Sequence, residues 1–351
     1  MTVSACRAYV AGLPAALMAT ALWGFTFLGP AAVAPVNVYY LVVGRYGVFG
    51  LMSLAVLITH HRVGLRGLGP RRLLTALHLG VVGYIGFYLL LAMSAELGGG
   101  VLASTMTGLI PLMVTVVSNL LEKVLAWRRL VLPIAAISLG LLLVNSGAPA
   151  DSSAGGRDPA FGAVLGFLAS AAWSYFVIVN RRTLERARPA VDGTTWTACI
   201  GIGACLGSLL LLPLALTGGG RSPFADAGTL WPYLAWCVAL AALGSWCATW
   251  FWNLASERLP ATVMGPVIGM EAVFGAAFNL LWEGRTPAFH ELWGGLLVVA
   301  GVLLASYLFN RAGLTRTAEP QQADLVIKAP APASPEPRCS ATTDPPEKPF
   351  R

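Results

Sequence analysis

Residues 257–307 read ERLPATVMGPVIGMEAVFGAAFNLLWEGRTPAFHELWGGLLVVAGVLLASY, and residues 96–145 follow the same plan. Three landmark pairs are each separated by 161 residues: Glu96 and Glu257, Glu122 and Glu283, Gly140 and Gly301. In both copies Gly and Pro interrupt the apolar run between the two glutamates. Such interrupted segments at matching places in two halves of a chain indicate the binding region of a transporter.

The composition indicates a membrane protein. Of 351 residues, 56% are hydrophobic and only 11% are charged, whereas soluble domains carry about 25% charged residues. So few charges cannot cover a globule of this size, so lipid must surround most of the chain. The six cysteines show neither a CxxC motif nor metal-ligand spacing, so neither a disulfide nor a metal site is predicted.

Ten apolar runs of about 20 residues are each long enough to cross a hydrocarbon core of roughly 30 Å. A single helix satisfies its own backbone in lipid, so we expect an all-α integral membrane protein with ten transmembrane helices. The expected spans are 9–33, 36–59, 73–94, 99–121, 130–148, 160–180, 194–217, 230–254, 261–282 and 290–310.

The first run ends in Ala32-Val33-Ala34, which is similar to a signal-peptide cleavage box. The run is too long for a signal core, and Pro35 occupies the place where cleavage would occur. The run also has a later partner, because Trp23 matches Trp173. We therefore expect a retained first helix that matches the sixth.

The distribution of Lys and Arg predicts the orientation. Fifteen of these residues flank the spans on the side that holds the N-terminus, and the other side carries only Arg157, Arg221 and Arg285. Basic residues favour the cytoplasmic side, so both termini are expected there. The same residues explain the net charge of +7 as contact with anionic lipid headgroups, without nucleic acid as a partner.

Each half of the chain holds five spans, and an odd number forces the second copy to enter the membrane from the opposite side. We expect two inverted five-helix repeats, residues 1–150 and 158–312, related by a pseudo-twofold axis in the membrane plane. Residues 313–351 are rich in Pro, Ala, Glu and Thr, and we expect a disordered cytoplasmic tail.

No catalytic, nucleotide-binding or metal motif is present in the sequence, so no enzyme activity, cofactor or metal is expected. The four histidines are scattered, and we interpret them as interfacial or locally bonded.

Two ionisable residues lie near the middle of spans: Arg45 and Glu271 are each about ten residues in, or about 15 Å deep. A charge there costs at least about 2.5–3.5 kcal/mol and usually marks an internal site or a water-filled path. Glu271 could bind a cationic group of a substrate or carry a proton. The alternative is that Arg45 and Glu271 pair with each other and only hold the bundle together.

Other candidates for the substrate path are polar or aromatic. Thr107 adds a hydroxyl near the first interrupted segment, although it could instead bond to its own helix. Trp23 and Trp173 lie mid-span at equivalent positions, as a cavity wall or as helix packing. Tyr84 and Trp246 belong to the same dense set of aromatic residues.

Residues near helix ends have mainly structural interpretations. Glu122 and Glu283 end the fourth and ninth spans, where they could cap the following helix or act as gates. Asn119, Asn180, Asn253 and Asn279 are expected to form interhelical or interfacial hydrogen bonds.

The sequence resembles the EamA-type transporters of the drug/metabolite transporter superfamily over roughly residues 10–310. The matching positions are Ala21-Leu22-Trp23-Gly24, Arg45, Pro111 with Glu122, Met270-Glu271-Ala272, Glu283, and Gly294-Gly295 with Gly301. The family often has Leu-Glu-Pro where this chain has Met270-Glu271-Ala272, so a kink of the ninth helix at that point is in question, although Pro266 is nearby.

The resemblance implies export of small metabolites, amino acids or drugs across the inner membrane without ATP. It also implies a central cavity lined by spans 1–4 and 6–9. We therefore expect a secondary transporter with Trp23, Arg45, Tyr84, Thr107, Trp173, Trp246 and Glu271 along the path. Its partners would be a small-molecule substrate and membrane lipid; proton coupling and a homodimer are left open. The competing classes are an integral membrane enzyme acting on lipid and a membrane scaffold that does not transport.

Overall fold

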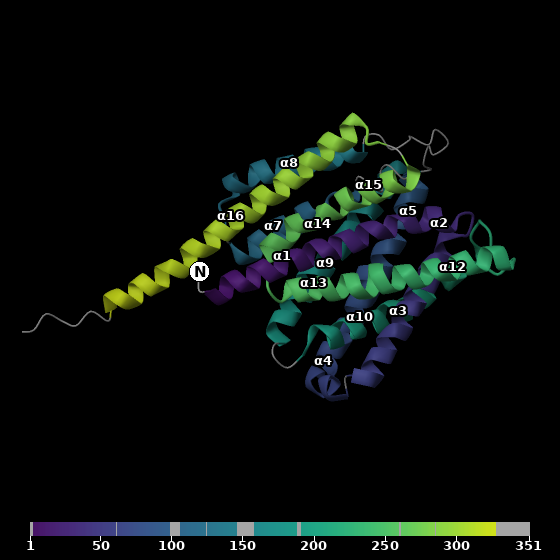
Figure 1. The fold of residues 1–351 in the computed structure, drawn as a ribbon, viewed down its shortest axis with the longest axis horizontal. Helices are drawn as coiled ribbons and strands as arrows, with labels where there is room; N and C mark the ends of the chain where they lie inside the picture. The colour runs from purple at the N-terminus through teal and green to yellow at the C-terminus, as the bar shows by residue number, and fades with distance from the viewer. Residues whose placement is uncertain are drawn as a thin grey trace, which may run out of the picture.

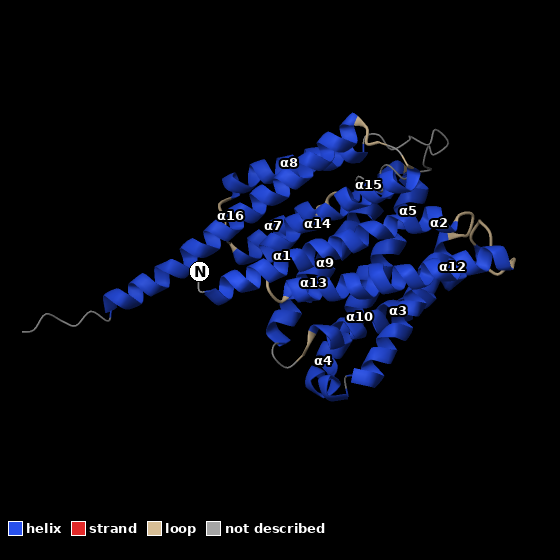
Figure 2. Ribbon diagram, viewed as in Figure 1, coloured by secondary structure: helices blue, strands red, loops and turns tan. Residues whose placement is uncertain are grey.

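The computed structural model describes residues 3–60, 62–98, 106–123, 125–145, 158–187, 191–259, 261–284 and 286–327. Over these residues the chain forms a bundle of helices joined by loops, and Figure 2 shows no strand among them. Segments η1 and η3 are 3₁₀-helices, and segments η2 and η4 are π-helices. In chain order, the helical segments are α1 Val3–Phe25, η1 Thr26–Leu28, α2 Gly29–Val33, α3 Val38–His60, α4 Arg62–Gly80, η2 Val81–Gly86, α5 Phe87–Gly98, α7 Ile110–Glu122, α8 Trp127–Asn145, α9 Pro159–Ala187, α10 Gly193–Ser208, η3 Leu209–Leu211, α11 Leu212–Thr217, α12 Ala227–Ala239, η4 Leu240–Cys247, α13 Ala248–Ser256, α14 Ala261–Ile268, α15 Met270–Glu283 and α16 Phe289–Ile327.

Eight helices in the described part of the chain are long and apolar enough to cross a membrane. They correspond to eight of the ten expected spans. The fourth expected span, 99–121, is represented by the shorter apolar helix Ile110–Leu121, because residues 99–105 lie outside the described ranges. The fifth, 130–148, is represented by α8, and residues 146–148 lie outside as well. Ten spans therefore stay a prediction.

Two helices are interrupted where the sequence places Gly. The ninth expected span breaks at Gly269, between α14 and α15. Just before α7 the chain forms a turn at Gly108 and Leu109, and Gly108 lies 161 residues before Gly269. The break at Gly269 settles where the ninth helix is interrupted: it lies three residues after Pro266 and two before Glu271, without a proline at Ala272.

The same two helices also end alike. Lys123 follows α7 with a φ of 49°, and Gly284 follows α15 with a φ of 64°. A left-handed residue after the last turn is a common way to end a helix. Glu122 and Glu283 are the last residues of these helices, and their side chains lie outside the described part, so their capping or gating roles stay predictions.

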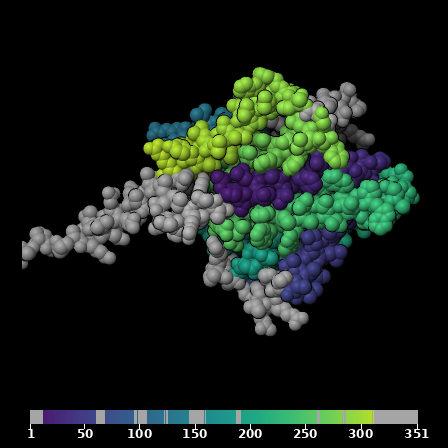
Figure 3. Space-filling model, in the orientation of Figure 1, coloured from purple at the N-terminus to yellow at the C-terminus, as the bar shows by residue number. Residues whose placement is uncertain are grey.

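Helices from the two halves of the sequence interleave in the bundle. Helix α1 packs against α13 and α15, and α9 packs against α5 and α7. Helix α3 packs against α10 and α12, and α8 packs against α16. Figure 3 shows α1 in purple running between segments from the green, C-terminal part of the chain. Because each of these helices contacts the other half of the chain, neither half forms a separate unit.

Several of these contacts are reciprocal. A Cβ added to Gly140 would lie 2.6 Å from the carbonyl oxygen of Gly294 and 2.7 Å from the nitrogen of Val298, and one added to Gly301 would lie 3.0 Å from the backbone of both Pro133 and Ile137. Gly294 and Val298 are 161 residues after Pro133 and Ile137. Equivalent glycines, one on each helix, therefore contact equivalent positions on the partner helix. Reciprocal contact of this kind is typical of a twofold arrangement.

A second reciprocal pair lies at the π-helical segments. Segment η2 follows α4, and segment η4 follows α12. A Cβ on Gly83 of η2 would meet the ring of Phe176 at 2.6 Å, and one on Gly244 of η4 would meet Thr26 at 2.2 Å. Gly244 is 161 residues after Gly83, and Phe176 and Thr26 lie three residues after Trp173 and Trp23. Wide π-turns inside α-helices occur frequently at functional sites.

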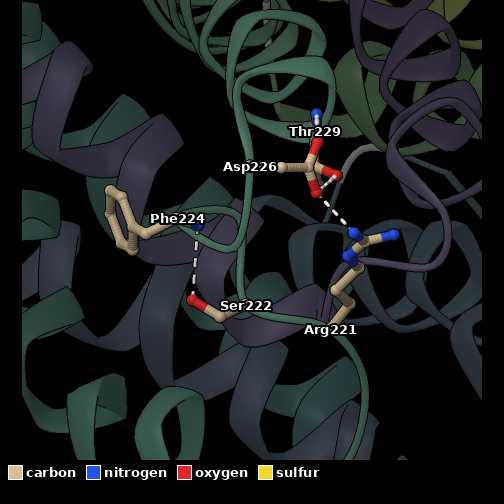
Figure 4. A network of polar contacts seen from close by, with 5 residues as sticks. All are labelled: Arg221, Ser222, Phe224, Asp226 and Thr229. Atoms are coloured by element: carbon tan, nitrogen blue, oxygen red, sulfur yellow. Dashed lines mark hydrogen bonds and ion pairs between the residues drawn. The ribbon is translucent and has the colours of Figure 1, made fainter.

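At one end of the bundle, the loop before α3 and the loop before α12 form an interloop contact (residues 35–37 with 221–229). The Asn37 nitrogen donates to the Arg221 carbonyl at 3.2 Å, and the Arg221 nitrogen donates to the Pro35 carbonyl at 3.0 Å. Figure 4 shows the guanidinium of Arg221 paired with Asp226, which also accepts from the Thr229 nitrogen at 2.8 Å and caps α12. This end lies opposite the N-terminus in Figure 1.

The last helix is longer than expected. Helix α16 continues to Ile327, so residues 313–327 are helical where the sequence predicts a disordered tail. The segment contains the good helix formers Ala, Leu, Arg, Glu and Gln, which extend the preceding helix without a new nucleus, although Gly313 and Pro320 are poor helix formers. Residues 328–351 lie outside the described ranges. In Figure 1 this helix leaves the bundle at the end where α1 begins.

Candidate functional site

Three of the predicted aromatic residues meet in the centre of the bundle. The ring centroids of Trp23 and Trp173 lie 5.3 Å apart, and those of Tyr84 and Trp173 lie 5.7 Å apart, both edge-on. The three side chains are 4%, 7% and 2% exposed, in that order. Edge-to-face rings at these distances attract each other beyond the burial of their area. The equivalent tryptophans of the two halves are therefore in direct contact.

Trp246 and Arg45 join this cluster through two residues of α3. Phe49 lies between Tyr84, at 6.1 Å, and Trp246, at 6.2 Å. Tyr46 lies 5.6 Å from Tyr84, and the guanidinium carbon of Arg45 is 5.2 Å from the centre of the Tyr46 ring, within the range of a cation–π interaction. Five predicted path residues thus belong to one connected set.

Arg45 is held by the π-helical segment η4. Its Nε donates to Ser245 Oγ at 2.8 Å, and its Nη2 donates to the Gly244 carbonyl at 3.0 Å. A glycine is required at 244, because Thr26 fills the space that a Cβ would occupy. Arg45 as a whole residue is partly exposed, and Nη1 makes no hydrogen bond with any described residue. The arrangement fixes a cation in place and leaves donors for an anionic group.

Glu271 lies in the first turn of α15, two residues after the break at Gly269. A carboxylate is favoured there by the partial positive charge of the helix start. The side chain is partly exposed. Within the described part of the chain it makes no hydrogen bond and no ion pair within 4.0 Å with Arg45, so the structure does not show the direct pairing that was the alternative interpretation of these two charges.

Helix α1 approaches Glu271 through a glycine. A Cβ on Gly24 would lie 3.0 Å from the Glu271 carbonyl oxygen and 2.7 Å from the nitrogen of Gly275. This contact gives a physical reason for Gly24 directly after Trp23: it lets the two backbones touch. One helix therefore carries Trp23 and also positions the segment that holds Glu271.

Thr107 lies at the turn before α7 and is partly exposed. Its neighbour Met106 accepts a hydrogen bond through its carbonyl from Ser170 Oγ of α9 at 2.7 Å. Ser170 is one turn before Trp173, so the interrupted segment lies beside the helix that carries the central tryptophan.

Several residues at the site were not singled out from the sequence. Tyr84 Oη forms a short hydrogen bond with Thr249 Oγ1, and Trp252 lies 5.1 Å from Trp23. Ser245 carries no pattern of its own, because it binds Arg45 from 200 residues away. Trp252 belongs to the same aromatic-rich stretch as Trp246, and that density was the available signal.

The asparagines divide into two groups. Asn180 and Asn253 form the expected interhelical bonds: Asn180 Nδ2 donates to Asn253 Oδ1 at 2.7 Å, and Asn253 Nδ2 donates to Thr197 Oγ1 at 2.8 Å. Asn119 instead bonds both backbone groups of Leu125, and Asn279 donates to the carbonyl of Gly275 in its own helix.

No group of three or more His, Cys, Asp or Glu residues that could hold a metal occurs within the described ranges. The polar groups at the site are a fixed guanidinium, a carboxylate, hydroxyls and indole nitrogens. These groups suit recognition of a small polar molecule.

Two comparisons with known proteins identify the family, and a third shows the fold. Residues 160–307 match the EamA-like transporter family. The chain is 30% identical over 318 residues to the "Inner membrane protein YtfF" of Escherichia coli (strain K12), covering 84% of this chain and 95% of that protein. A solved structure titled "Crystal structure of protein" superposes with a TM-score of 0.69 at 17% identity, covering 87% of this chain and 98% of that one, which shows a shared fold. The chain therefore belongs to the EamA-like transporter family of the drug/metabolite transporter superfamily.

Proposed function

We propose that this protein is a secondary transporter. It would export small metabolites, such as amino acids or drug-like compounds, across the inner membrane. The observation that carries the proposal is the environment of Arg45 and Glu271. Both residues lie near mid-span and are partly exposed, and the described structure shows no ion pair within 4.0 Å between them. An ionisable group at that depth by default marks a substrate or ion path.

The site favours a substrate with groups of both signs. Arg45 is anchored through two of its nitrogens and presents Nη1, which suits a carboxylate or another anion. Glu271 suits a cationic group, or carries a proton that couples transport to the proton gradient. The aromatic cluster of Trp23, Tyr84, Trp173 and Trp246, with Thr107 nearby, would line the path. An amino acid satisfies all of these groups.

We infer that transport proceeds by alternating access between two inverted five-helix repeats, 1–150 and 158–312, with ten spans and both termini in the cytoplasm. The reciprocal glycine contacts, the paired π-helical segments and the matched helix interruptions support a pseudo-twofold relation. Helix α16 leaves the bundle at the end where α1 begins, which supports a common side for the termini.

The test is efflux from cells and from proteoliposomes with the variants Arg45→Ala and Glu271→Ala. We expect both to abolish transport while membrane insertion and yield stay normal, because each removes a substrate-facing charge. Arg186→Ala is the matched control, since this arginine is exposed near the end of α9. Growth of a deletion strain against a panel of amino acids and drugs would name the substrate. Normal efflux from both variants would rule out this proposal and favour a scaffold that does not transport.

A further inference from the structure

Two buried indole groups in the central cluster have no hydrogen-bond acceptor among the described residues: Trp23 Nε1 and Trp252 Nε1. The two side chains are 4% and 0% exposed, and their rings lie 5.1 Å apart, tilted by 49°. One belongs to α1 and the other to α13. Two unsatisfied donors thus lie next to each other at the contact between the two halves of the chain.

Other tryptophans of the same bundle are satisfied. Trp196, which is also 0% exposed, donates to Asn180 Oδ1 at 2.7 Å, and Trp250, two residues before Trp252, donates to Thr194 Oγ1 at 3.0 Å. Buried indole N–H groups usually find a partner in this way. The unsatisfied pair at Trp23 and Trp252 therefore stands out within one protein.

Buried serine hydroxyls without hydrogen-bond partners are weaker evidence for a ligand site than the unpaired indoles. Ser53, Ser118, Ser256 and Ser306 also bury an unpaired oxygen, but a hydroxyl can rotate toward a carbonyl of its own helix. An indole N–H has a fixed direction and can only donate. Leaving a buried donor unpaired costs roughly 1–3 kcal/mol, and Phe would fill much of the same space without that cost.

The segment that anchors Arg45 packs against the chain on both sides of Trp23. A Cβ on Gly244, whose carbonyl accepts from Arg45, would meet the carbonyl of Leu22 in α1 and the side chain of Thr26 in η1. These are the residue just before Trp23 and the residue one turn after it. The Arg45 anchor therefore contacts residues close to Trp23 in the chain. A molecule that meets the guanidinium or an indole N–H must offer acceptor oxygens.

We propose that Trp23 and Trp252 together form a donor site for an oxygen of the transported molecule, of the carboxylate or carbonyl class. The proposal rests on the transport function proposed above and adds Trp252 to the path. The pair is enclosed by α1, α9 and α13, so α1 or α13 must move for the oxygen to enter, which alternating access provides. The two tryptophans would then favour a transported molecule that carries a hydrogen-bond acceptor as well as an apolar group.

The test compares Trp23→Phe and Trp252→Phe with Trp196→Phe, which removes an indole N–H that the protein itself uses. Without substrate, we expect the first two variants to melt at or above the wild-type temperature, since an unsatisfied donor is lost. Trp196→Phe should melt lower, because Asn180 loses its donor. A Trp252→Phe variant that melts as low as Trp196→Phe would show that the protein already satisfies this N–H, and would overturn the proposal.

Transport supplies the second readout. The wild-type protein in proteoliposomes is assayed with each of the twenty L-amino acids and, for each one transported, with the amine that lacks its carboxylate. We expect Trp23→Phe and Trp252→Phe to raise KM for the amino acid by about tenfold or more, with a small effect on the amine. Trp196→Phe should leave KM unchanged.

The outcomes separate the two proposals. Unchanged KM in both variants, with transport intact, would mean that bound water satisfies the indoles; the donor site would be wrong and the transport function would stand. Wild-type protein that moves none of the amino acids would reject the amino-acid assignment of the proposed function. The melting comparison would then decide the donor site, because it requires no substrate.

Discussion

Asn253 illustrates how a single polar residue joins three helices of this bundle. Its amide contacts Asn180 of α9 and Thr197 of α10, and Asn180 also accepts from Trp196. All four side chains are fully buried. In such a network every member depends on the others, because a lost partner leaves buried groups that water cannot reach.

We predict that Asn253→Ala lowers the free energy of unfolding by about 1–3 kcal/mol, the cost of leaving buried polar groups unpaired. Thermal or denaturant unfolding in detergent measures the change. Asn279→Ala serves as the control, because Asn279 is partly exposed and bonds only within its own helix. Equal stability of the two variants would show that the network contributes nothing.

At the scale of helices, close approach depends on glycines at crossing points. Gly24 meets the backbone of α15, where a methyl group would need space within 3.0 Å of three atoms. Gly47, in contrast, has no atom within 4 Å of an added Cβ. Gly24 therefore permits close contact between two helix backbones, whereas Gly47 has room for a side chain.

We predict that Gly24→Ala destabilises the protein by about 1–3 kcal/mol through overpacking and impairs transport by shifting α1 away from Glu271. Gly47→Ala should be neutral or stabilising by up to about 1 kcal/mol, because Ala is the better helix former. Melting temperature and initial efflux rate check both variants. A tolerated Gly24→Ala would mean that α1 and α15 are not in backbone contact.

The interloop contact is an element whose pH dependence can be predicted. Hydrogen bonds from Thr229, with Arg221 beside it, hold the pKa of Asp226 below its usual value of 3.8. A carboxyl whose pKa is lowered in the folded state stabilises the fold at any pH above its pKa in the unfolded state. That stabilisation is lost as the pH falls through the pKa of the folded state. The contact should therefore persist throughout the neutral range.

We predict that Asp226→Asn melts below the wild type at pH 7 and pH 5, because the ion pair and the charged cap of α12 are lost. The gap between the two proteins should narrow as the pH falls below 3.8 and close as it passes below the lowered pKa of the folded wild-type carboxyl. Unfolding followed by intrinsic fluorescence at pH 7, 5 and 3 measures it. A gap that widens toward pH 3 would contradict the assignment.

At the scale of the whole molecule, the twofold relation makes a prediction about equivalent positions. Gly140 and Gly301 are 161 residues apart, and each touches the partner helix across the contact of α8 with α16. We predict that Gly140→Val and Gly301→Val lower the melting temperature by similar amounts, since a side chain at either site meets backbone within 3.0 Å. A large effect from only one of them would show that the contact is not reciprocal.

The orientation of the chain can be tested at the same scale. Reporter fusions or impermeant labels placed after Arg311 and before Gly12 should report the same side, as two five-span repeats require, and the Lys and Arg distribution predicts that this side is the cytoplasm. A label near Ser222, in the loop before α12, should report the opposite side. Termini on different sides would reject the inverted repeat.

The sequence by itself determined the class of the molecule and the location of its charges. Few charges in a long apolar chain require lipid, Lys and Arg at the loops predict orientation, and Arg45 and Glu271 stand out because charges are costly in apolar spans. The interrupted helices were visible as Gly and Pro in matching segments of the two halves, with Gly108 and Gly269 separated by 161 residues, because Gly and Pro weaken a helix wherever they occur. These properties depend on local composition and spacing.

Only the tertiary structure decided which groups meet. Ser245 and the Gly244 carbonyl hold Arg45 from 200 residues away, and the unpaired state of the Trp23 and Trp252 indoles depends on what surrounds them on three helices. Hydrogen bonding requires atoms within about 3 Å, and that distance is set by helix crossings and by the π-turn at η4, neither of which a one-dimensional pattern fixes. The sequence supplies the chemical groups, and packing between the two halves decides which of them remain available to a substrate.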